Sequence, residues 1–171
     1  MPTAPADKSP RDCTIADALE VVGDRWSLLA VRELFYAQRR FTEIARNTGA
    51  PRDILTARLR KLVEHGVIAR EEYSRRPPRY EYRLTDAGRA LAPVLLTLKR
   101  WGHEHLRDGT DPVRFDHTCG HEFVAEVHCT ACGDALATGQ LTLQPSADGG
   151  ADQRADAVGD RQARRTAEDE A

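Results

Sequence analysis

Apolar residues recur at helical spacing in the stretch from residue 51 to residue 66. Leu55, Leu59 and Leu62 follow one another at i, i+4 and i+7, which places them on one face of a helix. Pro51 suits the start of such a helix, and Gly66 suits its end because glycine accepts a left-handed backbone. The stretch is therefore predicted to be an amphipathic helix, and its polar side is mostly basic, with Arg52, Thr56, Arg60 and Lys61.

Three shorter helices are predicted before this one. The first covers residues 14–22 and places Ile15, Ala18, Leu19 and Val22 on one face. The second covers residues 26–36 after Asp24, whose carboxylate can accept from the free N–H groups of a first turn. The third covers residues 42–46, with Thr42 as its N-cap, and residues 47–50 form a turn. A short helix, a glycine-containing turn and a basic second helix are typical of a helix-turn-helix.

Two short runs rich in β-forming residues follow Gly66, at 67–73 and 80–84. The residues between them contain two prolines, which favour an extended tip, and three arginines, Arg75, Arg76 and Arg79. A hairpin in this place predicts a wing. A solvated turn would also accommodate these charges, but three arginines at one tip favour contact with phosphates or with the minor groove of DNA.

A last helix is predicted from Thr85 onwards. It carries a long stripe at helical spacing, formed by Leu91, Val94, Leu95, Leu98, Trp101 and His105. Pro93 lies inside this stripe, and it either kinks the helix or marks a later start. A small helical domain cannot bury the whole stripe, so part of it is predicted to pack on a second subunit. Packing on helix 14–22 of the same chain is the alternative.

The charge of the chain is unevenly distributed. The net charge is −2, yet residues 11–107 hold 19 Lys and Arg against 13 Asp and Glu, and residues 144–171 hold 4 Arg against 7 acids. A basic middle agrees with a nucleic-acid-binding core, although charge alone does not identify the partner. No apolar run approaches the ~18 residues of a membrane span, and residues 1–10 lack the core of a signal peptide. We therefore expect a cytoplasmic protein with no membrane partner.

Taken together, seven segments resemble the HxlR-type, MarR-like winged-helix transcriptional regulators. They are Cys13 and residues 23–29, 32–34, 40–44, 55–62, 77–82 and 84–88. The resemblance covers residues 13–102 and rests on the ordered series of segments. It implies a homodimer held by the first and last helices of the domain, with helix 51–66 in the major groove and the wing near the DNA backbone or minor groove.

This interpretation gives double-stranded operator DNA as the partner. It also divides the predicted DNA-contacting residues into those that contact phosphates and those that lie near base edges. Phosphate contacts are predicted for Arg40, Arg75, Arg76 and Arg79, whereas Arg52, Thr56, Arg60 and Lys61 are predicted near base edges. Arg58 lies beside the apolar face of the helix, so pairing with an acid inside the domain is an alternative to DNA contact.

Cys13 is a candidate redox sensor. Some members of the family that the chain resembles sense electrophiles or oxidants through a cysteine near the N-terminus, and Cys13 stands at the matching place. Arg11 nearby favours a thiolate, whereas Asp12 and Asp17 oppose it. A small residue packed near the dimer surface is the alternative. An oxidant or small-molecule effector is therefore compatible with the sequence.

A Cys/His-rich segment follows the predicted helical domain. Cys129 and Cys132 stand two residues apart and are followed by Gly133, the pattern of half a zinc ribbon, in which a tight turn directs both sulfurs at one ion. Cys119 with either His117 or His121 would complete a structural Zn²⁺ site across a hairpin whose strands contain Phe123, Val124 and Val127. A disulfide between Cys129 and Cys132 is the alternative. Catalytic zinc is not favoured, because no pocket is indicated.

The chain is thus predicted to be mainly α with a small β-hairpin, an α+β fold. Residues 11–107 form a winged helix-turn-helix domain for DNA binding and dimerisation, 113–143 a small Cys/His-rich β module, and 1–10 and 144–171 disordered ends. The predicted function is that of a dimeric, sequence-specific DNA-binding regulator rather than an enzyme. The alternative is a zinc-stapled protein–protein interaction adaptor without specific DNA binding.

Overall fold

The computed structural model describes residues 13–137, 139, 141 and 142. The chain divides into two compact units, Met1–Arg114 and Phe115–Ala171, and each is described by itself. The ends predicted to be disordered, 1–10 and 144–171, lie outside the described residues.

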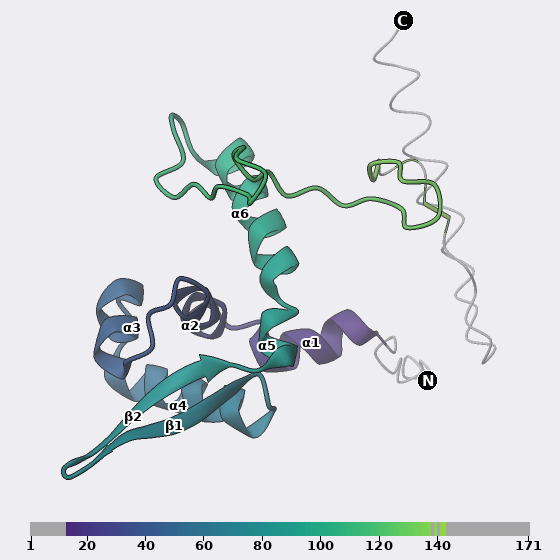
Figure 1. The fold of residues 1–171 in the computed structure, drawn as a ribbon. Helices are drawn as coiled ribbons and strands as arrows, with labels where there is room; N and C mark the ends of the chain where they lie inside the picture. The colour runs from purple at the N-terminus through teal and green to yellow at the C-terminus, as the bar shows by residue number, and fades with distance from the viewer. Residues whose placement is uncertain (1–12, 138, 140, 143–171) are drawn as a thin grey trace, which may run out of the picture. The chain divides into compact units, whose positions relative to one another are not determined.

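The described part of the first unit has the predicted winged helix-turn-helix fold, mainly helical with a small antiparallel hairpin (Figure 1). Its elements follow in the order α1 Thr14–Val22, α2 Arg25–Phe35, α3 Phe41–Thr48, α4 Arg52–Glu64, β1 Ile68–Arg75, β2 Pro78–Leu84, α5 Asp86–Arg89 and α6 Ala92–Leu106. None of the helices in the described ranges is long and apolar enough to cross a membrane.

The core lies where α2, α3, α4 and the base of the hairpin meet. Leu55, Leu59 and Leu62 of α4 are almost fully buried, so the inward face predicted from their spacing is confirmed. They pack with buried residues of the neighbouring elements, among them Val31, Leu34, Ile44 and Ile68. Burying leucine side chains of this kind contributes about 1.5–3 kcal/mol each, which fixes α4 on the domain and leaves its other face outside.

Local hydrogen bonds set where the helices begin. The Asp24 carboxylate accepts from the backbone N–H groups of Trp26 at 2.9 Å and Ser27 at 3.3 Å, which confirms the predicted cap of α2. The predicted cap of α3 was wrong. α3 begins at Phe41, one residue before Thr42, and its N-cap is Arg40, whose backbone N–H donates to Glu43 Oε2 at 3.0 Å. A glutamate at the third helical position supplies this contact.

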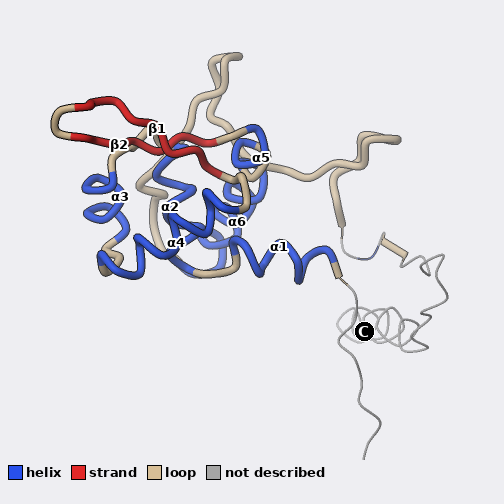
Figure 2. Tube along the Cα trace, turned by 90° about the horizontal axis from the view of Figure 1, so that it is seen from below, coloured by secondary structure: helices blue, strands red, loops and turns tan. Residues whose placement is uncertain are grey.

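The wing is a longer hairpin than the sequence predicted. β1 and β2 pair from Ile68 opposite Leu84 to Arg75 opposite Pro78, with an irregularity between Glu72 and Ser74. The segment 74–79, predicted as a loop, is therefore mostly strand, because ladder pairing continues to the last residues before the turn. The tip reaches beyond the helices in both views (Figure 1 and Figure 2).

The predicted last helix is divided in two. Thr85 caps the short helix α5 by accepting from the backbone N–H of Gly88, and α6 then begins at Ala92 with Pro93 in its first turn. Pro93 thus marks a later helix start, one of the two alternatives, since proline lacks the N–H that a helix interior requires. Leu91 and Leu95 pack against the core, whereas Val94, Leu98 and Trp101 are about half exposed.

The second unit consists of turns in its described part. The β module predicted around Phe123, Val124 and Val127 was wrong in its strands, since these residues lie outside any strand and, within the described residues, the unit has only isolated bridges, between Asp116 and Glu122 and between His128 and Ala135. The predicted apolar strand residues remain 38–61% exposed. A strand pattern needs a partner face to bury its side chains, and this segment supplies too few apolar residues to form one.

Candidate nucleic-acid interface and cysteine turns

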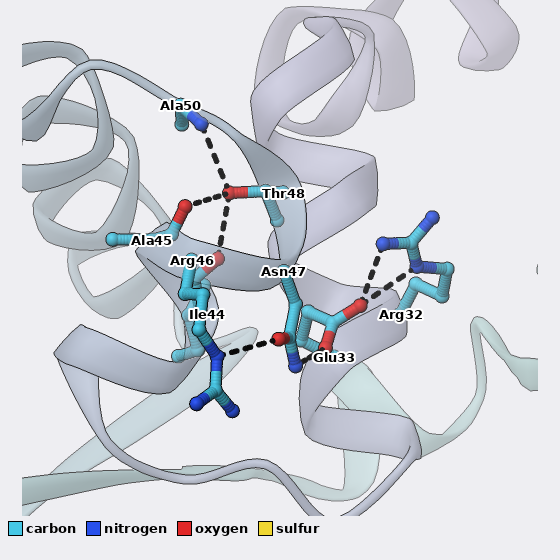
Figure 3. Close-up of polar contacts among 8 residues, drawn as sticks. All are labelled: Arg32, Glu33, Ile44, Ala45, Arg46, Asn47, Thr48 and Ala50. Carbon is cyan, nitrogen blue, oxygen red and sulfur yellow. Dashed lines mark hydrogen bonds and ion pairs between the residues drawn. The ribbon is translucent and has the colours of Figure 1, made fainter.

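The turn between α3 and α4 is fixed by one threonine (Figure 3). The Thr48 hydroxyl donates to the carbonyl of Ile44 at 2.7 Å and accepts from the backbone N–H of Ala50 at 3.2 Å. Gly49 has φ +71°, a left-handed conformation that costs other residues more than glycine. These contacts set the angle at which α4 leaves α3, and therefore the direction of the basic helix.

A buried carboxylate ties the same turn to α2 (Figure 3). Glu33 is only 3% exposed, and its Oε2 accepts from the side-chain amide of Asn47 at 2.7 Å. Its Oε1 accepts from Arg32 Nε at 3.0 Å and Nη2 at 2.6 Å. Because a buried charge is stable only when it is paired and hydrogen-bonded, this arrangement fixes Asn47 at the end of α3.

The outer face of α4 presents three of the predicted base-contacting residues. Arg52, Thr56 and Arg60 are exposed. The Arg52 guanidinium lies 5.2 Å from the centre of the Phe41 ring, and the Thr56 hydroxyl donates to the carbonyl of Arg52 at 2.7 Å. Arg60 pairs with Glu64 at 3.5 Å, a contact that costs little to release because both side chains are largely exposed.

Lys61, the fourth residue of α4 that was predicted near base edges, contacts α1 instead. Lys61 Nζ donates to the backbone carbonyl of Glu20 in the last turn of α1 at 2.5 Å. A cation in this place satisfies a free carbonyl at the negative end of a helix. Arg58 forms an ion pair with Asp24, with 3.0 Å between Nε and Oδ1, so the alternative of pairing inside the domain is confirmed for this residue. Both side chains thus help to anchor α4 to the helices before it.

The tip of the wing carries three exposed arginines, Arg75, Arg76 and Arg79. Within the described ranges none of the three takes part in an ion pair. Further down the hairpin, Arg83 is held between Glu71 and Glu81, each at 2.6 Å, and these contacts raise its pKa, the hydrogen bond to Glu81 most. The positive charge of the wing is therefore available at its tip and balanced near its base.

Arg40 joins the wing to the helices. It pairs with Glu81 of β2 in an isolated β-bridge, and its guanidinium lies 5.4 Å from the centre of the Tyr73 ring. The preceding carbonyl, of Arg39, accepts from the backbone N–H of Tyr82 at 2.9 Å. Arg40 therefore stands between the start of α3 and the hairpin.

The cysteines of the second unit lie in two turns of similar build. In each turn a glycine with positive φ, Gly120 at +87° and Gly133 at +81°, directly follows a cysteine. Cys119 Sγ lies 3.7 Å from His121 Nδ1. Backbone N–H groups of Cys132 and Ala131 hydrogen bond to the Cys129 sulfur and lower the pKa of its thiol. Each turn could supply two neighbouring ligands, but no group of three or more His, Cys, Asp and Glu side chains suited to a metal forms among the described residues.

Cys13, the remaining candidate, is partly exposed and stands at the N-cap of α1. Its carbonyl accepts from the backbone N–H of Asp17 at 3.2 Å.

Sequence reasoning overlooked Glu33 and Asn47 as organisers of the turn. The available signal was an acid among Ala30, Val31 and Leu34, where the helical pattern predicts the core. An ionised group at such a place needs partners, and a partner 14 residues away cannot be identified from spacing alone.

Comparisons with known proteins agree that the chain is similar to helix-turn-helix regulators. A family model described as HxlR-like helix-turn-helix matches residues 21–110. An HTH-type transcriptional regulator of Mycobacterium tuberculosis is 45% identical over 134 residues, which cover 77% of this chain and 85% of the relative. Another from Synechocystis is 40% identical over 95 residues, 55% of this chain and 70% of that one. The first of these alignments must extend beyond Arg114, given its length, and so includes part of the second unit.

Two solved structures are similar to the chain in fold. The protein PA1607, proposed to be a transcription factor, superposes with a TM-score of 0.69 at 36% identity, covering 80% of this chain and 97% of that one. The redox regulator HypR in its oxidised form gives a TM-score of 0.51 at 35% identity and covers 57% of this chain and all of that one.

Proposed function

Because the chain belongs to the HxlR-like helix-turn-helix family, we propose that it is a transcriptional regulator that binds operator DNA as a homodimer. In this proposal α4 lies in the major groove, with Arg52, Thr56 and Arg60 near base edges. The wing tip contacts the backbone or the minor groove. The single observation that carries the proposal is the set of three arginines at the wing tip, which are exposed and form no ion pair among the described residues. They belong to the same unit as α4, whose polar face is also exposed.

For two residues, Lys61 and Arg40, the structure changes the DNA contact that we expect. Lys61 would have to release the Glu20 carbonyl before reaching DNA, so it is expected to contribute less than Arg60. Arg40, at the junction of α3 and the wing, is proposed to contact a phosphate between the two DNA-binding elements. Both residues remain predictions for DNA contact.

The dimer is supported by apolar side chains that the first unit leaves exposed. Ile15 and Leu19 of α1 are 68% and 55% exposed, and Val94 and Trp101 of α6 are each 51% exposed. Figure 1 shows α6 extending away from the part formed by α2, α3 and α4. Large apolar side chains gathered on two helices mark a surface for association. We propose that this surface, the α1/α6 apolar face, packs against its copy in a second chain.

Selection of binding sites from random double-stranded DNA tests the function and the dimer together. The full chain should select two half-sites with centres about 10 base pairs apart. Trp101→Glu should yield a monomer in analytical ultracentrifugation and weaken binding to the selected site at least about a hundredfold, because a charge in an apolar interface is desolvated without a partner. Val124→Glu, at an exposed apolar residue of the second unit, is the control and should remain dimeric.

The adaptor alternative predicts a different result in the same experiment. An adaptor without specific DNA binding would bind any duplex at low salt only and would yield no enriched sequence. A monomeric wild type, or a Trp101→Glu variant that remains dimeric, would contradict the proposed interface.

We also propose that the two cysteine turns hold one structural Zn²⁺ through Cys119, His121, Cys129 and Cys132. Three thiolates and an imidazole are a common ligand set for zinc. The Cys119–His121 contact favours His121 over His117 as the fourth ligand. The two pairs would have to approach each other on binding, and a small unit with few buried apolar residues gains stability from such a staple.

Metal analysis of freshly purified full chain decides the zinc proposal. About one Zn²⁺ per chain is expected, and Cys129→Ser should lose most of it, whereas Cys13→Ser should retain it because Cys13 lies outside the unit that contains the turns. His117→Ala should retain zinc and His121→Ala should not. A wild type with far less than one zinc per chain would contradict the site, and a mass 2 Da lower under non-reducing conditions would indicate a disulfide instead.

Oxidant sensing by Cys13 stays a prediction. Two observations favour it: the similarity to HypR, a redox regulator, and the position of Cys13 at the start of α1. Because α1 belongs to the α1/α6 apolar face, oxidation there would act on the proposed dimer.

A further inference from the structure

The pairing between the two strands of the wing passes over one residue of β1, Tyr73. Glu72 lies opposite Tyr80. The next pair joins Ser74 to Arg79, so β1 has one residue more than β2 at this place. A bulge of this kind interrupts the regular alternation of side chains along a strand and redirects the extra one. The redirected Tyr73 side chain contacts a residue from outside the hairpin.

That residue is Arg40, at the start of α3. Its guanidinium lies 5.4 Å from the centre of the Tyr73 ring. The backbone fixes the two elements beside each other, because Arg40 pairs with Glu81 of β2 and the carbonyl of Arg39 accepts from the backbone N–H of Tyr82 at 2.9 Å. The contact therefore joins the helix-turn-helix to the wing, the two parts of the proposed DNA-binding surface.

Three acids on the elements around Arg40 already have partners. Arg83 pairs with both Glu71 and Glu81, each at 2.6 Å. Glu43 Oε2 accepts from the backbone N–H of Arg40 at 3.0 Å. The Arg40 guanidinium itself takes part in no ion pair within the described ranges. Its contact with an aromatic ring thus takes the place of a contact with a carboxylate.

An aromatic ring holds a guanidinium in a different way from a carboxylate. The ring attracts the cation through its quadrupole and can stack on the flat face of the guanidinium, which leaves the N–H groups at the edge free. A carboxylate would occupy those N–H groups in a bidentate pair. Phosphate is bound by the same N–H groups. An arginine held by a ring is therefore fixed in place and can still bind the DNA backbone.

We propose that Tyr73 is a positioning residue for DNA binding, which holds the Arg40 guanidinium ready for a phosphate between α4 and the wing. Without the ring, the long arginine side chain would have to be ordered when DNA binds, and this ordering weakens binding. It could also turn toward Glu43 or Glu81, which would then compete with the phosphate. The inference rests on the proposed function, and it adds a residue that does not itself have to contact DNA.

Proton NMR of the free full chain tests the contact without DNA. The ring current of Tyr73 should shift the side-chain resonances of Arg40, which are identified by their absence from Arg40→Ala. The shift should disappear in Tyr73→Leu and persist in Tyr73→Phe, because phenylalanine retains the ring. Arg40 resonances that are the same in the wild type and in Tyr73→Leu would overturn the proposal.

Titrations with the DNA site selected above test the role in binding. Tyr73→Leu should weaken binding at least about fivefold, since both subunits lose the contact, and Tyr73→Phe should stay within about twofold of the wild type. The slope of log K against log salt should fall in Tyr73→Leu toward that of Arg40→Ala, which loses about 0.9 per half-site. In the Arg40→Ala background, Tyr73→Leu should cost less than about twofold, because the residue that it positions is gone.

Tyr80 provides a matched control on the same hairpin. Tyr73 and Tyr80 are similarly exposed, 43% and 38%, and the Tyr80 ring lies 3.6 Å from the guanidinium of Arg70 in β1. Tyr80→Leu therefore removes the same kind of contact and leaves Arg40 and its ring in place. It should weaken binding less than about twofold, and equally in the wild-type and Arg40→Ala backgrounds. Equal losses from Tyr73→Leu and Tyr80→Leu would indicate a loosened wing and would overturn the positioning role.

The remaining outcomes separate this inference from the proposed function. A loss by Tyr73→Phe as large as by Tyr73→Leu would assign the contact to the tyrosine hydroxyl and overturn the proposal. So would a loss by Tyr73→Leu that is undiminished in the Arg40→Ala background. If the wild type selects a DNA site and Tyr73→Leu binds it equally well, only the positioning role is wrong. If the wild type selects no site, the proposed function fails and the inference fails with it.

Discussion

Replacing the three tip arginines by alanine, as Arg75→Ala, Arg76→Ala and Arg79→Ala together, should weaken operator binding by about 10²–10³-fold near 0.1 M salt. Each phosphate contact releases counterions, so log K falls with log salt by about 0.9 per contact. The triple variant should therefore reduce the slope by up to about 3 per wing. The tip side chains are exposed and make no ion pair among the described residues, so the free energy of unfolding should change by about 0.5 kcal/mol or less.

The matched control keeps the charge and changes only the shape of the donor. Lysine at the same three positions should preserve most of the salt slope, because a phosphate contact needs a cation more than a guanidinium. Binding titrations at four or more salt concentrations give both slopes. A triple alanine variant whose slope equals that of the wild type would exclude contact between the wing and the DNA backbone. A loss by the lysine variant as large as by alanine would indicate instead that the guanidinium shape is read, as in the minor groove.

The sequence was sufficient where structure depends on near neighbours. The leucine spacing of α4 identified the buried face, and Asp24 and Gly66 identified a helix start and a helix end, because caps act over three or four residues. The wing followed from two β-rich runs close in sequence. Resemblance to a family, carried by segments spread over residues 13–102, added the fold that no single segment specifies.

The features that could not be predicted from the sequence depend on contacts between residues that are far apart in the chain. Lys61 reaches a carbonyl 41 residues earlier in the chain, and Asn47 reaches Glu33 over 14 residues. Neither distance has a periodic signature. A cavity of about 400 Å³ is likewise lined by residues from α2, from α6 and from 111–113, which are brought together only by the fold. The strands expected in the second unit failed for the opposite reason, since a local apolar pattern was present but the part of that unit that the structure describes offers no surface for it to pack on.

Gly88→Ala should cost about 3 kcal/mol of unfolding free energy, the upper part of the range for overpacking. Gly88 lies in α5, and an added Cβ would stand 2.2 Å from the carbonyl oxygen of Val67 and 3.0 Å from Leu84 Cδ2. The Val67 oxygen cannot withdraw freely, because it accepts from both the backbone N–H and the hydroxyl of Thr85, at 3.2 and 2.9 Å. Relieving the contact would therefore separate α5 from the base of the wing and break its N-terminal cap.

Gly102→Ala in α6 is the matched control, because it adds the same methyl group where nothing lies within 4 Å. It should stabilise the chain by about 0.5–1 kcal/mol, since alanine loses less backbone entropy than glycine in a helix. Urea denaturation followed by helical circular dichroism measures both changes. The two variants should thus move the midpoint in opposite directions. If the free energy of unfolding of Gly88→Ala lies within about 0.5 kcal/mol of that of the wild type, the close packing of α5 on Val67 is not what holds the wing to the last helices.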